Sequence, residues 1–158
     1  MDTHAGLARL VEPSNEDVLR DEFVERAGII AQDEGLPRIA GRILGVLLYS
    51  GAEMSFSELA EHLDVSRGSI STNVRMLADR GVVERVGKPG DRQDWFRIGD
   101  DAFEGLLRNA ARRAANAHAS IAKVRDRMKD GPARTRVARY ARFYEAIERG
   151  VSAAAEDL

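Results

Sequence analysis

Residues 55–98 read SFSELAEHLDVSRGSISTNVRMLADRGVVERVGKPGDRQDWFRI, and this stretch decides the fold. Ser55 is a good helix N-cap and Glu58 lies three residues further on, which is the spacing of a capping box. The helix that starts here has one apolar face and is expected to end at Asp64-Val65; that face consists of Leu59, Ala60 and Leu63. A second helix, a chain reversal and two short strands follow, which predicts a helix-turn-helix with a β-hairpin wing.

The second helix is predicted to be the one that reads DNA. Ser66 is placed to cap it, and Gly81 is placed to end it in the left-handed conformation. One side of this helix is apolar and consists of Ile70, Val74, Leu77 and Ala78. Small and hydrogen-bonding residues lie opposite or near the helix start, where a recognition helix meets base edges and phosphates. The predicted DNA contacts from this helix are Ser66, Arg67, Gly68, Ser69, Ser71, Thr72, Asn73 and Arg75.

The wing is predicted from two β-branched and aromatic runs on either side of a turn. The outgoing strand is expected at Val82, Val83 and Val86, and the return strand at Trp95, Phe96 and Ile98. The tip, residues 87–92, contains two cations, Lys88 and Arg92, which we expect to contact the DNA backbone or the minor groove. Asp91 is interpreted as a turn residue that also orients Arg92.

Three segments resemble the MarR superfamily of bacterial regulators, and most closely its GbsR-like branch. They are GLPRIAGRILGVLL (residues 35–48), SFSELAEHLDVSRGSISTNVRML (residues 55–77) and KPGDRQDWF (residues 88–96). The resemblance implies a winged helix-turn-helix whose terminal helices form a homodimer on double-stranded DNA, and a short strand before Ser55 that joins the wing. It implies a transcriptional regulator, expected to be a repressor that acts on an inverted-repeat operator. The alternative is a winged-helix module that binds protein without specific DNA binding.

The composition of the chain excludes several classes of protein. Its 158 residues are enough for a proper core, and it has no cysteine for disulfides or thiolate metal sites. No apolar run has the length of a membrane span and no signal peptide is evident, so we expect a cytoplasmic protein without a membrane partner. The net charge is −2, but residues 12–64 have 4 Arg/Lys against 12 Asp/Glu, while residues 65–97 have 7 against 4. Positive charge therefore begins at the predicted DNA-reading region.

Two helices are predicted before this region. The first begins at Ser14 or Asn15 and runs to about Asp33, with an acidic side expected to face solvent or, alternatively, the basic last helices. Its apolar residues are Val18, Phe23, Ala27 and Ile30. The second, about residues 37–49, is apolar most of the way round and should be the central buried helix. Its Gly41 and Gly45 predict close packing of another helix, while Arg38 and Arg42 are expected to bind phosphate or the acidic first helix.

Two long helices are predicted after the wing. The first should run from residue 99 to about Asp130, with a heptad seam of apolar residues: Leu107, Ala110, Ala114, Ala117, Ile121, Val124 and Met128. The last helix repeats the pattern with Val137, Tyr140, Tyr144, Ile147 and Val151. These seams predict a homodimer; the alternative is an intramolecular hairpin with one face in water. The predicted organisation is a flexible N-terminal arm (1–14), a winged-helix DNA-binding domain (15–99) and a helical dimerisation region (100–158), a mainly α fold with a small β wing.

No enzymatic or cofactor chemistry is indicated by the sequence. It contains no phosphate-binding glycine loop, nucleophile elbow or HExxH motif, so we expect no catalytic residues, no cofactor and no metal site. His4, His62 and His118 lack partners at metal-ligand spacing and are expected to be solvent-facing or hydrogen-bonded. The resemblance to GbsR-like regulators implies a choline-type effector. Four aromatic residues can form a cation–π cage for such a cation: Trp95, Tyr140, Phe143 and Tyr144. Packing of Trp95 under the wing and of the tyrosines in the dimer seam is the favoured interpretation, and the ligand-binding residues are left unassigned.

Overall fold

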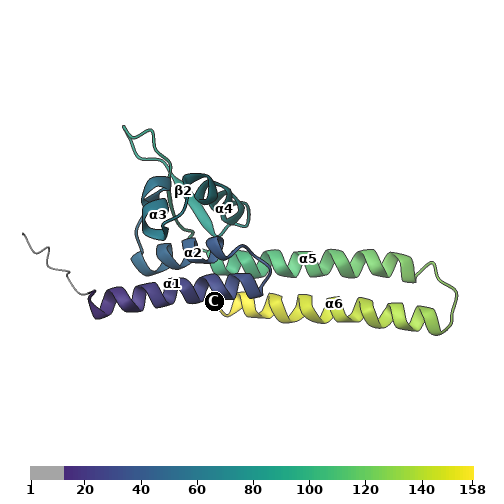
Figure 1. The fold of residues 1–158 in the computed structure, drawn as a ribbon. Coiled ribbons are helices and arrows are strands. Elements are labelled where there is room, and N and C mark those ends of the chain that lie inside the picture. Colours follow the sequence, from purple (N-terminus) through teal and green to yellow (C-terminus); the bar gives the residue numbers. More distant parts are fainter. Residues whose placement is uncertain (1–12) are drawn as a thin grey trace, which may run out of the picture.

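The structure is a computed structural model that describes residues 13–158. Its elements in chain order are α1 (Asn15–Asp33), α2 (Arg38–Ser50), β1 (Met54–Ser55), α3 (Phe56–Leu63), α4 (Arg67–Asp79), β2 (Val83–Val86), β3 (Trp95–Ile98), α5 (Ala102–Arg125) and α6 (Pro132–Glu156). Figure 1 shows two parts, which we call the head (residues 38–99) and the helical arm (residues 102–156). The fold is mainly helical with a small sheet, as predicted. Most of the predicted N-terminal arm lies outside the described residues.

The helix-turn-helix forms through the predicted caps. Ser55 Oγ accepts a hydrogen bond from the Glu58 N–H at 3.3 Å, and the Glu58 carboxylate accepts one from the Ser55 N–H at 2.7 Å. This second bond is the first cause of the lowered pKa of Glu58. Ser66 Oγ accepts from the Ser69 N–H at 3.2 Å and starts α4. Gly81 has a φ of 75° just after α4, as its role as a left-handed cap requires.

The wing is a three-stranded antiparallel sheet with the order β1-β3-β2. In the pairing of β2 with β3, Val83 lies opposite Ile98 and Val86 lies opposite Trp95. The short β1 strand pairs Ser55 with Trp95 on the other side of β3. The third strand that the family resemblance implied is therefore present, and it ties the wing directly to the start of α3.

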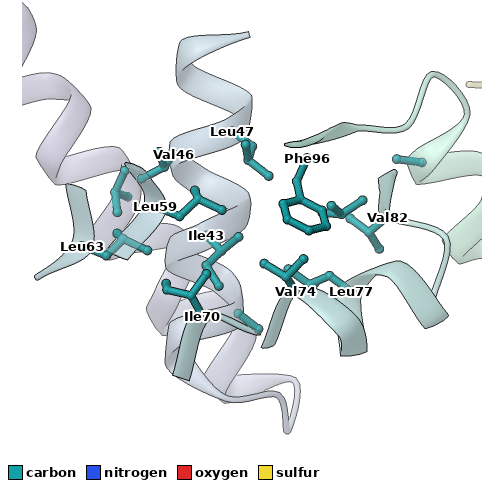
Figure 2. Packing of buried hydrophobic residues seen from close by; sticks show 14 residues of the cluster. Ile43, Val46, Leu47, Leu59, Leu63, Ile70, Val74, Leu77, Val82 and Phe96 are labelled. Carbon is teal, nitrogen blue, oxygen red and sulfur yellow. The ribbon is translucent and has the colours of Figure 1, made fainter. Parts of the chain in front are cut away.

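Aliphatic side chains from α2, α3, α4 and the wing meet in one core (Figure 2). Ile43, Leu59 and Ile70 have 0% exposure, and each fully buried side chain of this size contributes about 1.5–3 kcal/mol. The core also includes Val46, Leu47, Leu63, Val74, Leu77, Val82 and Phe96. This packing fixes α4 by one side only and leaves its other side free to face outward.

The glycines of α2 let α1 approach closely, as predicted. A Cβ on Gly41 would lie 2.2 Å from the Ala27 carbonyl oxygen, and one on Gly45 would lie 3.0 Å from Val24 Cα. Arg38 and Arg42 both pair with Glu25 of α1, at 2.5 and 2.7 Å, as the ion-pair alternative predicted. These guanidinium groups, Arg38 first, lower the pKa of Glu25.

Three of the four apolar residues predicted to mark α1, Val18, Phe23 and Ile30, are exposed, whereas the fourth, Ala27, is half-buried at the α2 glycines. The buried residues of α1 are Val24, Gly28 and Ala31. The close approach at the α2 glycines brings this side of α1 against α2. Phe23 lies near Tyr49 of α2, with ring centroids 6.1 Å apart.

The helical arm is an antiparallel pair that extends away from the head (Figure 1). Its closest packing involves small residues: Ala111, Ala114 and Ala141 are buried. The prediction that α5 reaches about Asp130 was wrong, because α5 ends at Arg125 and the next residues form tighter turns toward Gly131. Residues 126–131 are needed to reverse the chain before Pro132 starts α6. Within the described residues, no helix is both long and apolar enough to cross a membrane.

Candidate nucleic-acid interface

One side of α4 is exposed along the whole length of the helix. Arg67, Gly68, Thr72 and Arg75 are exposed, whereas Ile70, at 0% exposure, anchors the opposite side in the core. Ser69 and Ser71 lie half-buried at the edges of the exposed side. The structure therefore brings most of the predicted DNA-contacting residues of α4 onto one outward surface, which we call the α4 face.

The small residues at the start of the α4 face make different local contacts. Ser66 uses its hydroxyl oxygen as the helix cap, and Thr72 donates its hydroxyl to the Gly68 carbonyl at 3.1 Å. At Gly68, an added Cβ would meet only Ser66 Oγ, at 4.0 Å. Packing inside the described chain thus does not require glycine at this position, although glycine in a helix costs roughly 0.5–1 kcal/mol relative to alanine.

Asn73 was included among the predicted contacts but does not belong to the α4 face. It is 8% exposed, and its Nδ2 donates to the Ser69 carbonyl at 2.8 Å. Its spacing could have indicated this, because Asn73 is three residues after Ile70 and four before Leu77, on the apolar side of the helix. In the position that the structure shows, the amide group is turned inward, so we do not include Asn73 among the proposed base contacts.

The two cations of the wing tip have different surroundings. Arg92 is exposed, and within residues 13–158 no carboxylate pairs with it or with the α4-face residues Arg67 and Arg75. Lys88 is half-buried, pairs with Glu53 at 3.2 Å and lies over the Trp95 ring, with Nζ 3.4 Å from the ring centroid. The two cations were predicted as equivalent contacts, but Lys88 already has partners inside the chain, whereas the Arg92 side chain is exposed.

Asp91 was predicted to orient Arg92, but its side chain binds the Trp95 indole instead. Its carboxylate accepts from the Gln93 backbone N–H at 2.8 Å and from the Trp95 indole N–H at 2.9 Å, and these two bonds, in this order, lower its pKa. No side-chain bond to Arg92 forms among the described residues. The tip turns because the Asp91 N–H donates to the Lys88 carbonyl at 3.1 Å, with Gly90 at a φ of 80°. Proline followed by such a glycine is the pattern of a type II turn.

Sequence reasoning missed the residues that support the wing. Glu53, just before β1, pairs with Lys88, and Arg85 of β2 pairs with Asp94, just before β3, at 2.5 Å. The opposite charges of Arg85 and Asp94 on the two sides of the wing were a signal that could have suggested their pair. No local signal identified Glu53, because its partner Lys88 lies 35 positions later in the chain.

The described histidines each lie beside a backbone carbonyl oxygen, and the candidate aromatic residues lie on two different elements. His62 Nδ1 lies 3.1 Å from the Glu58 carbonyl and His118 Nδ1 lies 2.9 Å from the Ala141 carbonyl; His4 is outside the described residues. A cluster of possible metal ligands does not occur within residues 13–158. Tyr140, Phe143 and Tyr144 group together on α6, and the Tyr140 hydroxyl raises the pKa of Tyr144. Trp95 belongs to β3 of the wing and not to α6, and Lys88 covers its ring.

Comparison with known proteins agrees with this geometry. The model of the MarR family matches residues 34–94, the segment from the start of α2 to the wing. The chain is 44% identical over 95 residues to the HTH-type transcriptional regulator MmpR5 of Mycobacterium tuberculosis, covering 60% of this chain and 58% of that protein. It is 31% identical over 87 residues to the HTH-type transcriptional repressor OpcR of Bacillus subtilis, covering 55% of this chain and 47% of that protein. The chain thus aligns with about half the length of these curated relatives.

A solved structure of a transcriptional regulator extends the likeness beyond the head. It is 34% identical, has a TM-score of 0.74, and is matched over 87% of this chain and 96% of its own. The curated relatives and this solved structure are all named as transcriptional regulators and none as an enzyme, which agrees with the expectation that the chain is not an enzyme. Residues 34–94 of this chain match the MarR family, and most of its length is similar to a transcriptional regulator of known structure.

Proposed function

We propose that the chain is a sequence-specific DNA-binding regulator that acts as a homodimer, and that it represses transcription from an inverted-repeat operator. The observation that carries the proposal is the α4 face. Its exposed residues point away from a rigid core, and the exposed cation Arg92 lies on the wing of the same head. A helix held in this way can enter the major groove while the wing contacts the flanking backbone.

The proposed roles follow from exposure and side-chain chemistry. Arg75 can donate two parallel hydrogen bonds to guanine, and Thr72 can contact a base or a phosphate. Arg67 and Arg92 are proposed as phosphate contacts. Gly68 is proposed to let the DNA backbone approach the start of α4, because nothing inside the described chain accounts for a glycine there. Ser66, Ser69 and Ser71 border this surface and are proposed as secondary contacts.

A second copy of the chain is proposed to cover the helical arm. Val124, Tyr140 and Phe143 are 56%, 53% and 55% exposed, whereas the residues buried between α5 and α6 are alanines. The first helix also exposes apolar residues, and the chain's acidic first part and basic last part are of opposite net charge. Association of two copies removes this apolar surface from water and presents two α4 faces to one DNA duplex.

The proposal also includes repression of transcription and membership of the GbsR-like branch. Repression is supported by the name of OpcR, a transcriptional repressor that shares the head region. A small-molecule effector is proposed to act in a cavity of about 390 Å³ between the end of α2, the connection to β1 and the end of β3. A ligand there would lie beside Arg97 and Ile98 of β3 and Asp100, which precedes α5. The aromatic group on α6 is the proposed alternative for a choline-type cation.

The proposal is tested by binding to random-sequence duplex DNA at two salt concentrations. A DNA reader releases counterions from phosphates, so its affinity should fall steeply between ~50 and ~200 mM salt. A protein-interaction module should barely bind at either concentration, and this result would overturn the proposal. Arg67→Ala and Arg92→Ala are each expected to reduce the salt slope by about one unit. The matched control is Arg26→Ala on α1, which removes an exposed cation away from the α4 face and should leave the slope unchanged.

A further inference from the structure

The single tryptophan of the chain is held from three sides at the base of the wing tip. Its indole N–H donates to the Asp91 carboxylate at 2.9 Å, and its ring face carries Lys88 Nζ at 3.4 Å from the centroid. The backbone of Trp95 pairs with β1 and β2 on its two sides. Lys88 is in turn paired with Glu53, which lies just before β1. We call Glu53, Lys88, Asp91 and Trp95 the wing clasp.

The wing clasp joins parts of the head that are distant in sequence. Glu53 belongs to the connection that leads into β1 and α3, whereas Lys88 and Asp91 belong to the wing tip. Because Lys88 bonds Glu53 and covers Trp95 while Asp91 bonds the indole, the tip is tied to the sheet and to the entry of α3. A two-stranded tip without such contacts has little that fixes its angle.

The charged residues of the wing clasp, Lys88 and Asp91, interact with partners inside the chain. Lys88 faces one carboxylate and one aromatic ring at short range, so moving it to a DNA phosphate would leave Glu53 unpaired and the ring uncovered. Asp91 is an acid at the tip of a wing and would repel phosphate if its only role were electrostatic. Its two short hydrogen bonds give it a structural role that outweighs this repulsion.

We propose that Lys88, Asp91 and Trp95 are positioning residues that hold the wing at the angle at which Arg92 reaches the DNA backbone. This inference rests on the proposed function. It differs from the sequence prediction for Lys88, because it assigns phosphate contact to Arg92 and support to Lys88. Glu53 is the anchor of this arrangement on the side of the head.

The change in DNA affinity caused by Asp91→Ala has opposite signs if the wing acts only by its charge and if the wing clasp positions it. Removing a negative charge from a purely electrostatic wing should tighten binding to DNA. The clasp predicts the reverse: binding of a random-sequence duplex should weaken by about three- to tenfold, because two hydrogen bonds that hold the tip are lost. Equal or tighter binding by Asp91→Ala, at an unchanged thermal midpoint, would overturn the proposal.

Trp95 fluorescence supplies a measurement that does not need DNA. Acrylamide, a neutral quencher, should reach the indole more readily in Asp91→Ala and in Lys88→Met than in the wild type. Arg92→Ala is the matched control, since it removes a cation of the same tip that does not touch the indole, and its quenching should equal that of the wild type. Lys88→Arg should restore both quenching and DNA affinity, because a guanidinium can also pair with Glu53 and lie over the ring.

These results separate the failure of the clasp from the failure of the proposed function. If the wild type does not bind duplex DNA, the proposed function is wrong, and the role of the clasp in DNA binding falls with it. If the wild type binds while Lys88→Met and Lys88→Arg behave alike in quenching and affinity, only the clasp proposal is overturned. The clasp and the proposed function are both supported if Asp91→Ala and Lys88→Met show increased quenching and weaker DNA binding, and if Lys88→Arg behaves like the wild type.

Discussion

The head and the helical arm bury very different side chains. In the head, α2, α3, α4 and the wing direct large aliphatic residues into one core, and Ile43, Leu59 and Ile70 have 0% exposure. In the arm, the buried residues are alanines, while Tyr140 and Phe143 are about half exposed. The head can therefore hold its shape by itself, whereas the arm brings two helices together through small residues and leaves its large side chains available for another surface.

This difference separates the two tasks proposed for the chain. A DNA-reading surface needs rigid support, because side chains must meet base edges in a fixed geometry, and α4 obtains that support from the core beneath it. An association surface needs exposed apolar area, which the arm provides.

The largest effect is expected from Leu59→Ala in the head. Deleting a fully buried leucine side chain should lower the free energy of unfolding by about 2–5 kcal/mol, because a cavity is left in a closely packed core. This loss should be the same at every protein concentration. Phe143→Ala in the arm should instead cost stability only where copies associate, and denaturant unfolding at several protein concentrations distinguishes the two. A concentration-independent loss of several kcal/mol at Phe143 would show that the arm has a core of its own.

The second prediction concerns association through the arm. Tyr140→Glu combined with Phe143→Glu should leave the single chain folded, because both positions are exposed in it. The dissociation constant of the dimer should rise by ~100-fold or more, since charges cannot be buried without partners. Sedimentation at micromolar concentration measures this change. A wild type that sediments as a monomer would contradict association through the arm. The control is Arg136→Glu, an exposed charge reversal on the same helix, which tests whether added negative charge alone weakens the dimer.

The third prediction concerns the contact of α1 with the head. Gly41→Ala places a methyl group 2.2 Å from the Ala27 carbonyl, so α1 and α2 must separate. We expect a loss of about 1–3 kcal/mol in denaturant unfolding, which is typical of overpacking. Gly105→Ala is the control, because a Cβ at that helical position meets nothing within 4 Å among the described residues. If the two substitutions cost the same, the glycines of α2 do not determine the approach of α1.

The smallest effect on stability is expected at two glycines that have open space around them. Gly68→Ala in α4 and Gly150→Ala in α6 should each stabilise the chain by about 0.4–1 kcal/mol, because alanine loses less entropy in a helix. Only Gly68→Ala should weaken DNA binding, since its methyl group would stand where the DNA backbone is proposed to approach. Thermal midpoints and duplex affinities of both variants give the comparison. Unchanged DNA affinity in Gly68→Ala would remove this position from the proposed contact surface.

Local sequence signals predicted the head well and the arm less well. The capping box at Ser55, the cap at Ser66, the glycine after α4 and the β-branched and aromatic runs of the wing are short-range features, so their consequences could be predicted without tertiary information. The end of α5 could not, because the heptad pattern continues to Met128 although the chain has to reverse before Pro132. The α1 face was also misjudged, since which side of α1 is buried depends on where the α2 glycines admit it.

The candidate site shows the same limit. The α4 face follows from helical periodicity, and the same periodicity could have predicted the inward position of Asn73. The different surroundings of Lys88 and Arg92 were not predictable, because Lys88 is held by Glu53, which is remote in sequence and lies outside the wing. Side-chain type identified the cations of the tip, and only the fold shows which of them remains available.

The central claim is that the α4 face reads DNA, and selection of bound sequences from a random duplex library tests it most directly when the wild type and Arg75→Ala are compared. The wild type should enrich an inverted repeat with half-site centres about one helical turn apart. Arg75→Ala should keep its thermal midpoint within a few degrees and lose preference at one base pair in each half-site, symmetrically. No enriched sequence from the wild type, or an unchanged preference in a folded Arg75→Ala, would contradict the claim that the α4 face lies in the groove.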